Sequence, residues 1–249
     1  MYLARDVHVL RELADRTGLH ILTNTGQYKE PFLPRKTLES TPDEIAEGWI
    51  GEATGGIDGT DIRPGCVKTA VQLPAVAAAA GAADPPAALP DAQERVTRAA
   101  AITSNATRLT IATHTGVVDA AHLVLDILAE YGVAPDRWIF VHAQNEPDPA
   151  RILEVAERGA WVELDCIQDD TVEQHLQLFL GLIDAGHASQ LLLSHDGGWY
   201  DVGREPYEKR PFTALSDRFL PEARRRGVSD RLLTQVTVAN PARAYACRP

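Results

Sequence analysis

The chain has 249 residues, of which 45% are hydrophobic and 24% are charged, and its formal net charge is −11. This acidic balance argues against nonspecific binding to nucleic acid, because neutralising phosphates requires a basic surface. No apolar run is long enough to cross a bilayer, so a membrane-spanning protein is also excluded.

The first third of the chain predicts an order of helix, strand, helix and strand. Apolar residues at helical spacing predict a helix over 3–16, and a short apolar run predicts a strand over 19–24. Residues 40–44 combine a capping hydroxyl with Pro and acids in a first turn, so a second helix is expected there. A strand over 65–71 follows. The stretch 72–90 is rich in Ala and Pro and is interpreted as a surface insertion.

From about residue 91 the pattern alternates regularly. The expected helices are 91–105, 120–131, 149–158 and 171–186, followed by two closing segments, 211–227 and 229–246, with Asn240 expected to cap a last short helix. The six expected strands are 19–24, 65–71, 108–114, 138–142, 160–165 and 190–195. Such alternation is typical of βα units in a parallel sheet. The predicted fold is therefore α/β, as one domain over residues 1–249.

Three widely spaced cysteines, Cys66, Cys166 and Cys247, argue against a disulfide framework and suit a reducing compartment. Residues 1–17 mix charged and apolar residues and contain no hydrophobic core of a secretory signal. The expected location is therefore cytoplasmic.

Four residues follow or end apolar strands at the edge where parallel strands leave a core: Lys68, His114, His142 and Asp196. Taken singly, each has a plain interpretation: a surface lysine, two core histidines and a turn residue before two glycines. Their shared position at strand ends instead favours convergence on one site, as in an α/β barrel. Three other histidines, at positions 122, 175 and 187, fall in expected helices or at their ends and are expected to be solvated.

The ordered set of these four residues resembles the phosphotriesterase family of the amidohydrolase superfamily, which includes aryldialkylphosphatases and phosphotriesterase-like lactonases. The resemblance covers nearly the whole chain and includes the segments Arg5-Asp6, Thr25-Gly26, Ala112-Thr-His-Thr115 and Val238-Ala-Asn-Pro-Ala-Arg243. It implies a TIM (β/α)8-type barrel. Because only six strands are recognised after a lone helix, the barrel is expected to be incomplete at the N-terminus, with six of eight strands present.

The resemblance also implies a chemistry. Lys68 would be carboxylated by carbon dioxide, and the carbamate would bridge two divalent metals, most often zinc. His114 and His142 would bind one metal, and Asp196 would bind the other and accept a proton. A metal-activated hydroxide would attack a small-molecule phosphoester, lactone or related ester. Homodimers are common in the family, so the resemblance admits a homodimer.

Some features depart from the family pattern. The family begins with His-x-His on its first strand, and no His-x-His occurs here, so strand 1, helix 1 and strand 2 are expected to be absent. Lys68, His114 and His142 alone would make a single site with an open position. Two alternatives therefore remain: a catalytically inactive remnant that acts as a binding protein, and a mononuclear amidohydrolase acting on an amide.

Two further positions leave the substrate and the proton path open. Cys166 stands where relatives often carry a larger polar residue, and Asn145 stands where an acid often helps to relay a proton. Tyr28 and the pair Trp199-Tyr200 are expected to line the pocket with aromatic faces.

Overall fold

The computed structural model describes residues 5–73, 88–198 and 212–247, and it has an α/β fold built on one parallel sheet. Six strands lie in the order β1-β2-β3-β4-β5-β6, and each neighbouring pair is parallel. The strands are β1 (Asn24–Thr25), β2 (Cys66–Ala70), β3 (Thr110–His114), β4 (Trp138–Val141), β5 (Trp161–Leu164) and β6 (Leu191–Leu193). The expected six parallel strands are confirmed, and all their carboxyl ends share one edge.

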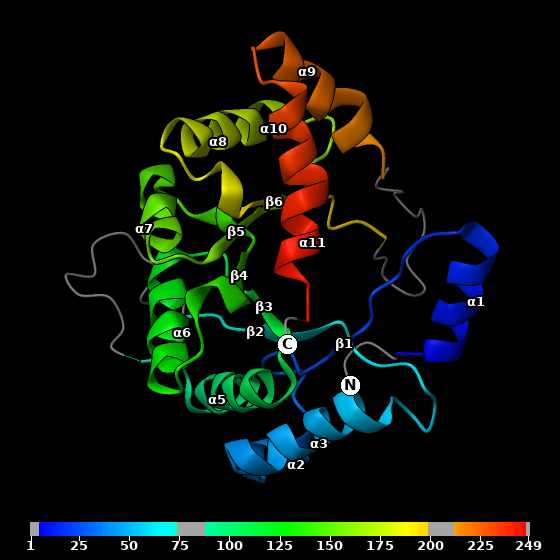
Figure 1. Cartoon of the computed structure of the whole chain (residues 1–249). Coiled ribbons are helices and arrows are strands. Elements are labelled where there is room, and N and C mark those ends of the chain that lie inside the picture. The colour runs from blue at the N-terminus through cyan, green and yellow to red at the C-terminus, as the bar shows by residue number, and fades with distance from the viewer. Residues whose placement is uncertain (1–4, 74–87, 199–211, 248–249) are drawn as a thin grey trace.

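Helices connect successive strands and follow one another around the outside of the sheet (Figure 1). The longer helices are α1 (Val7–Thr17), α3 (Pro42–Gly55), α5 (Asp91–Thr107), α6 (Val118–Glu130) and α8 (Val172–Asp184). The shorter α-helices are α2 (Arg35–Glu39), α7 (Ile152–Glu157), α9 (Leu220–Arg225), α10 (Asp230–Thr234) and α11 (Asn240–Ala244). Single π-helical turns, η5 (Leu215–Phe219) and η6 (Gln235–Ala239), precede α9 and α11, so the two expected C-terminal helices are each continuous helical runs.

The two faces of the sheet belong to two separate cores. Successive side chains of a strand point to opposite faces, and β4 shows the result. Trp138 and Phe140 join the large core beneath the helices, whereas Ile139 and Val141 join a small inner cluster with Trp161 of β5. The apolar part of the sequence therefore fills both the outer layer and the inner face.

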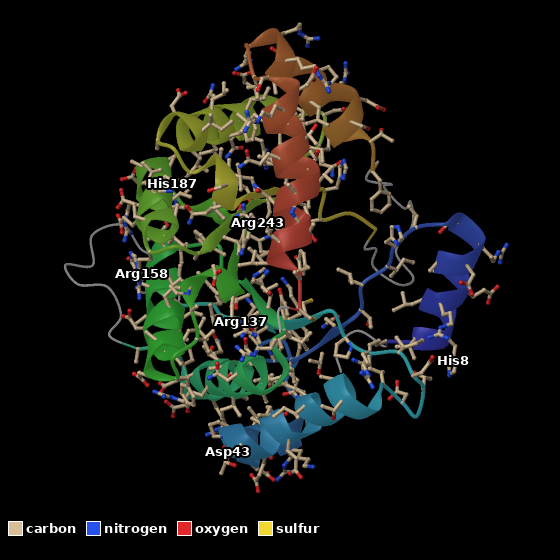
Figure 2. All side chains as sticks on the ribbon, viewed as in Figure 1. His8, Asp43, Arg137, Arg158, His187 and Arg243 are labelled. Atoms are coloured by element: carbon tan, nitrogen blue, oxygen red, sulfur yellow. The ribbon has the colours of Figure 1, made fainter. Side chains whose placement is uncertain are left out.

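The C-terminal helix closes the inner face near the beginnings of the strands. Thr110, the first residue of β3, donates a hydrogen bond from Oγ1 to the carbonyl of Ala244 at 2.6 Å. The Arg243 guanidinium, labelled in Figure 2, lies 5.0 Å from the ring centroid of Trp161. These contacts cover the amino end of the sheet and leave the carboxyl end for the polar side chains described below.

Asn240 fixes this helix to the sheet and does not cap it. Its buried side-chain amide donates to the carbonyls of Ala188 and Leu191, at 2.8 and 2.7 Å, and Ala239 occupies the capping position. The expected capping role was therefore wrong, because a tertiary partner replaces the local one.

Of the strand expected over 19–24, only Asn24 lies in β1, which continues to Thr25. Leu19 and Leu22 are 65% and 63% exposed, so this apolar run does not enter a core among the described residues. β1 pairs with β2 alone in the described sheet, and the Thr23 carbonyl accepts one more bond from the Gly65 N–H at 2.8 Å. An edge strand has a partner on one side only, and natural edge strands are often short.

Gly26 lets the end of β1 pass close to the end of β2. Its φ is +107°, and a Cβ built there would lie 2.1 Å from the carbonyl oxygen of Lys68. We expect Gly26→Ala to lower the free energy of unfolding by about 1–3 kcal/mol or more, since it combines a rare backbone conformation with a clash against backbone. Chemical denaturation would measure this loss.

Gly48 provides the matched control. It is exposed within α3, and a Cβ added there would have no atom within 4 Å. Gly48→Ala should raise stability by about 0.5–1 kcal/mol, because alanine loses less backbone entropy in a helix than glycine does. Equal effects of the two substitutions would contradict the close approach at Gly26.

No helix in the described part of the chain is both long and apolar enough to span a membrane. Most of the stretch expected as a surface insertion, 74–87, lies outside the described residues, as does the pair Trp199-Tyr200.

Candidate metal centre

Three of the four residues predicted from the sequence lie at the carboxyl edge of the sheet. His114 is the last residue of β3, His142 follows β4 directly, and Asp196 lies three residues beyond β6. Lys68, expected at a strand end, lies in the middle of β2, two residues before its last residue. Because parallel strands place their carboxyl ends together, His114 and Asp196 are brought to one edge from distant parts of the sequence.

His114 and His142 form the centre of this edge. Their ring centroids are 4.4 Å apart, with the planes at 76°, and the Tyr28 ring lies 5.3 Å from that of His114. Burial, together with the nearby charges of His142, Lys29 and Lys68, lowers the pKa of His114 to about 3. A neutral imidazole has a free lone pair, so His114 is suited to bind a cation.

Asp165, which follows β5, holds His142 in place. Its Oδ1 contacts His142 Nδ1 at 2.7 Å, and its Oδ2 accepts from the His142 backbone N–H at 2.8 Å. Gln144 donates to the same Oδ1 at 2.7 Å. Burial would raise the pKa of this carboxyl, but the hydrogen bonds from His142 and Gln144 outweigh it and lower the pKa. An ionised Asp165 fixes the His142 ring and leaves its Nε2 as the free nitrogen.

His142 and Asp165 belong to a group of four side chains whose donor atoms could bind a metal ion. One ligand-type atom from each of His142, Asp165, Cys166 and Asp196 lies within 4.8 Å of all the others. The Cys166 thiol contacts Asp196 Oδ2 at 3.6 Å. Burial and the charges of Asp165 and Asp196 raise the pKa of the Cys166 thiol to about 12. The negative charges of Asp165 and Asp196 disfavour a Cys166 thiolate while no cation is bound. The same charges attract a cation.

Lys68 is on β2, the strand next to that of His114. Its register partner is Ala112, two residues before His114 in β3. Ala112 belongs to the inner cluster, so Lys68 shares the inner face of the sheet. Its positive charge contributes to the lowered pKa of His114 and opposes the raised pKa of buried Glu163, whose main cause is burial. Its role as a ligand stays a prediction.

Asp165 is a functional residue that was not predicted from the sequence. It ends an apolar strand in the same manner as the four predicted residues, so the same signal was available. Its side chain is 1% exposed, which only the fold reveals. Cys166 was noted as a departure, but its proximity to Asp196 depends on the pairing of β5 with β6.

His175 was expected to be solvated, and this was wrong. It is 2% exposed, and its Nε2 donates to the carbonyl of Asp165 at 2.6 Å. Helix α8 therefore supports the backbone of the residue that orients His142. His195, next to Asp196 in sequence, accepts a hydrogen bond from the Leu215 N–H at 3.0 Å.

Known proteins with similar sequences and structures show which family this chain belongs to. The sequence matches the Phosphotriesterase family over residues 1–245. It is 30% identical to a singly substituted variant of an organophosphorus hydrolase of Deinococcus radiodurans, whose structure aligns with a TM-score of 0.83 over 97% of this chain and 76% of the other. The chain belongs to the phosphotriesterase family.

Other phosphotriesterase-family relatives are more distant. An aryldialkylphosphatase of Saccharolobus solfataricus is 28% identical over 99% of this chain and 78% of its own. An N-acetyltaurine hydrolase of Mus musculus is 24% identical over 96% of this chain and 69% of its own. A phosphotriesterase homology protein of Escherichia coli, solved with phosphate in its active site, shares the fold at a TM-score of 0.83 with 22% identity, covering 99% of this chain and 81% of the other.

The donor set fits the type of metal that the phosphotriesterase-like fold implies. Imidazole nitrogen, carboxylate oxygen and thiol sulfur are all ligands of zinc and similar ions. The donors come from three successive strand ends and lie close enough for one cation. His114 adds a second imidazole at the margin of the group.

Proposed function

We propose that this phosphotriesterase-family chain is a metal-dependent hydrolase that cleaves a phosphoester, a lactone or a related carboxylic ester. The observation that carries the proposal is the four-donor group at the strand ends, with His114 next to it. The named hydrolases among the relatives support the reaction class. The proposal treats residues 1–249 as one hydrolase domain.

Each side chain has a part in the proposal. His114 and His142 hold a divalent cation, and Asp165 keeps the His142 ring oriented through its hydrogen bond at 2.7 Å. Asp196 is exposed to solvent at the outer side of the group, where it can contact the attacking water and accept its proton. A divalent ion of the zinc type, when bound, lowers the pKa of water and polarises the oxygen of the bond to be cleaved.

Lys68 is proposed as the carbamate residue that completes the ligand set. An unmodified ammonium would repel a cation, whereas reaction with carbon dioxide converts it into an oxygen ligand with negative charge. Its place on the inner face beside His114 supports this assignment. Stronger metal binding in bicarbonate buffer, lost in Lys68→Ala, is the expected result.

Amide hydrolysis is a second candidate reaction. Relatives from several vertebrates are named N-acetyltaurine hydrolases, and the bond their name indicates is an amide. A cation and a proton acceptor in the same positions would promote attack of water on an acyl carbon as well as on a phosphorus atom. A panel of phosphotriesters, lactones and N-acyl amides therefore separates the candidates.

The test is metal loading followed by that panel. With bicarbonate present, we expect about one or two equivalents of zinc, cobalt or manganese per chain and hydrolysis of at least one substrate class. His142→Ala should lose both, whereas His187→Ala, a histidine labelled in Figure 2 that bonds to Gln190 in the η4 turn (Ala188–Gln190), should lose neither. Binding of less than about half an equivalent by the unaltered chain would contradict the proposal, and binding without turnover would favour a binding protein.

A further inference from the structure

Cys166 stands inside the donor group. Its sulfur lies 3.6 Å from Asp196 Oδ2 and within 4.8 Å of ligand atoms of His142 and Asp165. We propose that Cys166 is itself a metal ligand through its sulfur, so that the site selects thiophilic divalent ions such as zinc, cadmium and cobalt over magnesium and manganese. This inference rests on the proposed metal-dependent function and names the metal preference of that same site.

The hydrogen bonds divide the four donors into ligands and a support. Both carboxylate oxygens of Asp165 are already occupied, Oδ2 by the His142 N–H and Oδ1 by His142 Nδ1 and Gln144 Nε2. Asp165 therefore orients His142. With Asp165 as the support, the remaining donors of the group are a ring nitrogen of His142, the Cys166 sulfur and the Asp196 carboxylate, and His114 stands beside them as the second imidazole. Imidazole nitrogen, sulfur and carboxylate oxygen are all ligands that zinc takes in proteins.

The three remaining donors share an unusual backbone conformation. Cys166, His142 and Asp196 have φ values of +59°, +67° and +41°, in a region that residues other than glycine seldom occupy. Such strain concentrates where surrounding structure imposes it for a functional geometry. Here the surrounding structure is the pairing of β5 with β6, since the Ser194 N–H donates to the Leu164 carbonyl and the Ile167 N–H donates to the Ser194 carbonyl.

Sulfur changes which ions the site accepts. Thiolate ligands favour zinc and other soft or borderline ions, whereas magnesium and manganese favour oxygen ligands. On binding, the bond from sulfur to the proton is exchanged for a bond from sulfur to the metal, and the proton passes to the buffer. A site of imidazole and carboxylate ligands alone would already prefer zinc and cobalt to manganese and magnesium, so cadmium is the ion that tests what sulfur adds.

The chain contains its own controls. Cys66 lies at the start of β2 and Cys247 is exposed near the C-terminus, and neither belongs to the donor group. Cys66→Ser and Cys247→Ser therefore test whether a sulfur signal comes from another thiol.

Cobalt(II) titration of the full chain is the first measurement. We expect a thiolate-to-cobalt charge-transfer band in the near ultraviolet that is lost in Cys166→Ser and kept in Cys66→Ser and Cys247→Ser. Circular dichroism of each variant shows whether it folds. Competition should show that cadmium displaces cobalt readily from the unaltered protein and less readily from Cys166→Ser.

X-ray absorption of the zinc-loaded, unaltered protein is the second measurement and needs no variant. A zinc–sulfur distance of about 2.3 Å, beside nitrogen and oxygen at about 2.0–2.2 Å, is the expected result. Bound metal with only nitrogen and oxygen neighbours would overturn the inference and leave the proposed hydrolase intact. Failure to bind any metal would overturn both.

Discussion

Replacing Trp138 with alanine is expected to lower the free energy of unfolding by about 3–5 kcal/mol. Trp138 is fully buried where β4 packs beneath the helices, and its ring stacks on Phe140 at a centroid distance of 6.1 Å. Its Nε1 also donates to Thr113 Oγ1 at 2.8 Å. The substitution removes the apolar area, opens a cavity and takes a donor from a buried hydroxyl.

Such a loss is a large part of the free energy of unfolding of a typical domain, which is about 5–15 kcal/mol. Urea denaturation, followed by far-ultraviolet circular dichroism, measures it. Trp138→Phe is the matched control because it keeps an aromatic ring, and its cost should be clearly smaller. A loss below about 1 kcal/mol for the alanine variant would mean that β4 does not pack as described.

The second large effect is expected at Asp196. Replacing it with asparagine should lower kcat/KM of the metal-loaded protein by about 10²–10⁴-fold on whichever substrate of the panel is hydrolysed. Asparagine keeps the shape of the side chain, but it has no carboxylate to accept a proton. It also lacks the negative charge that Asp196 adds to that of Asp165. The measurement is steady-state kinetics together with the bound-metal content.

The metal content decides how that loss is interpreted. Reduced metal with reduced turnover assigns Asp196 to binding, and unchanged metal with reduced turnover assigns it to proton transfer. Asp184→Asn, at the exposed end of α8, is the control and should keep full activity. An Asp196→Asn variant as active as the unaltered protein would remove Asp196 from the proposed chemistry.

The site illustrates how far residue patterns reach. Lys68, His114, His142 and Asp196 were recognisable because each follows or ends an apolar run that predicts a buried strand. The structure places His114, His142 and Asp196 at one edge, with Lys68 two residues before the end of β2, and brings His142 and Asp196 into one donor group. Their roles as ligands remain predictions, because the distance from a side chain to a cation depends on contacts that no strand pattern encodes.

The contacts of other residues could not be predicted from local sequence. Asp165 follows an apolar run as the predicted residues do, but only the structure shows that its two oxygens accept hydrogen bonds from His142 and Gln144. His175 looks like a helical surface residue until the carbonyl of Asp165 is found beside it. Both depend on α8 and on β4 and β5 being packed together, which are contacts between segments far apart in the chain.

The sequence by itself determined the order of strands and helices, the parallel direction of the sheet and the edge at which polar side chains gather. These features follow from hydrophobic periodicity and from the helices that connect the strands, which are local properties of the chain. Only the tertiary structure decided that the run 19–24 forms strand at Asn24 alone, that the Asn240 side chain donates to the Leu191 carbonyl, and that the Cys166 thiol contacts Asp196. These outcomes follow from register and packing between distant segments, where the free energy of a hydrogen bond or a buried side chain depends on the partner that the fold supplies.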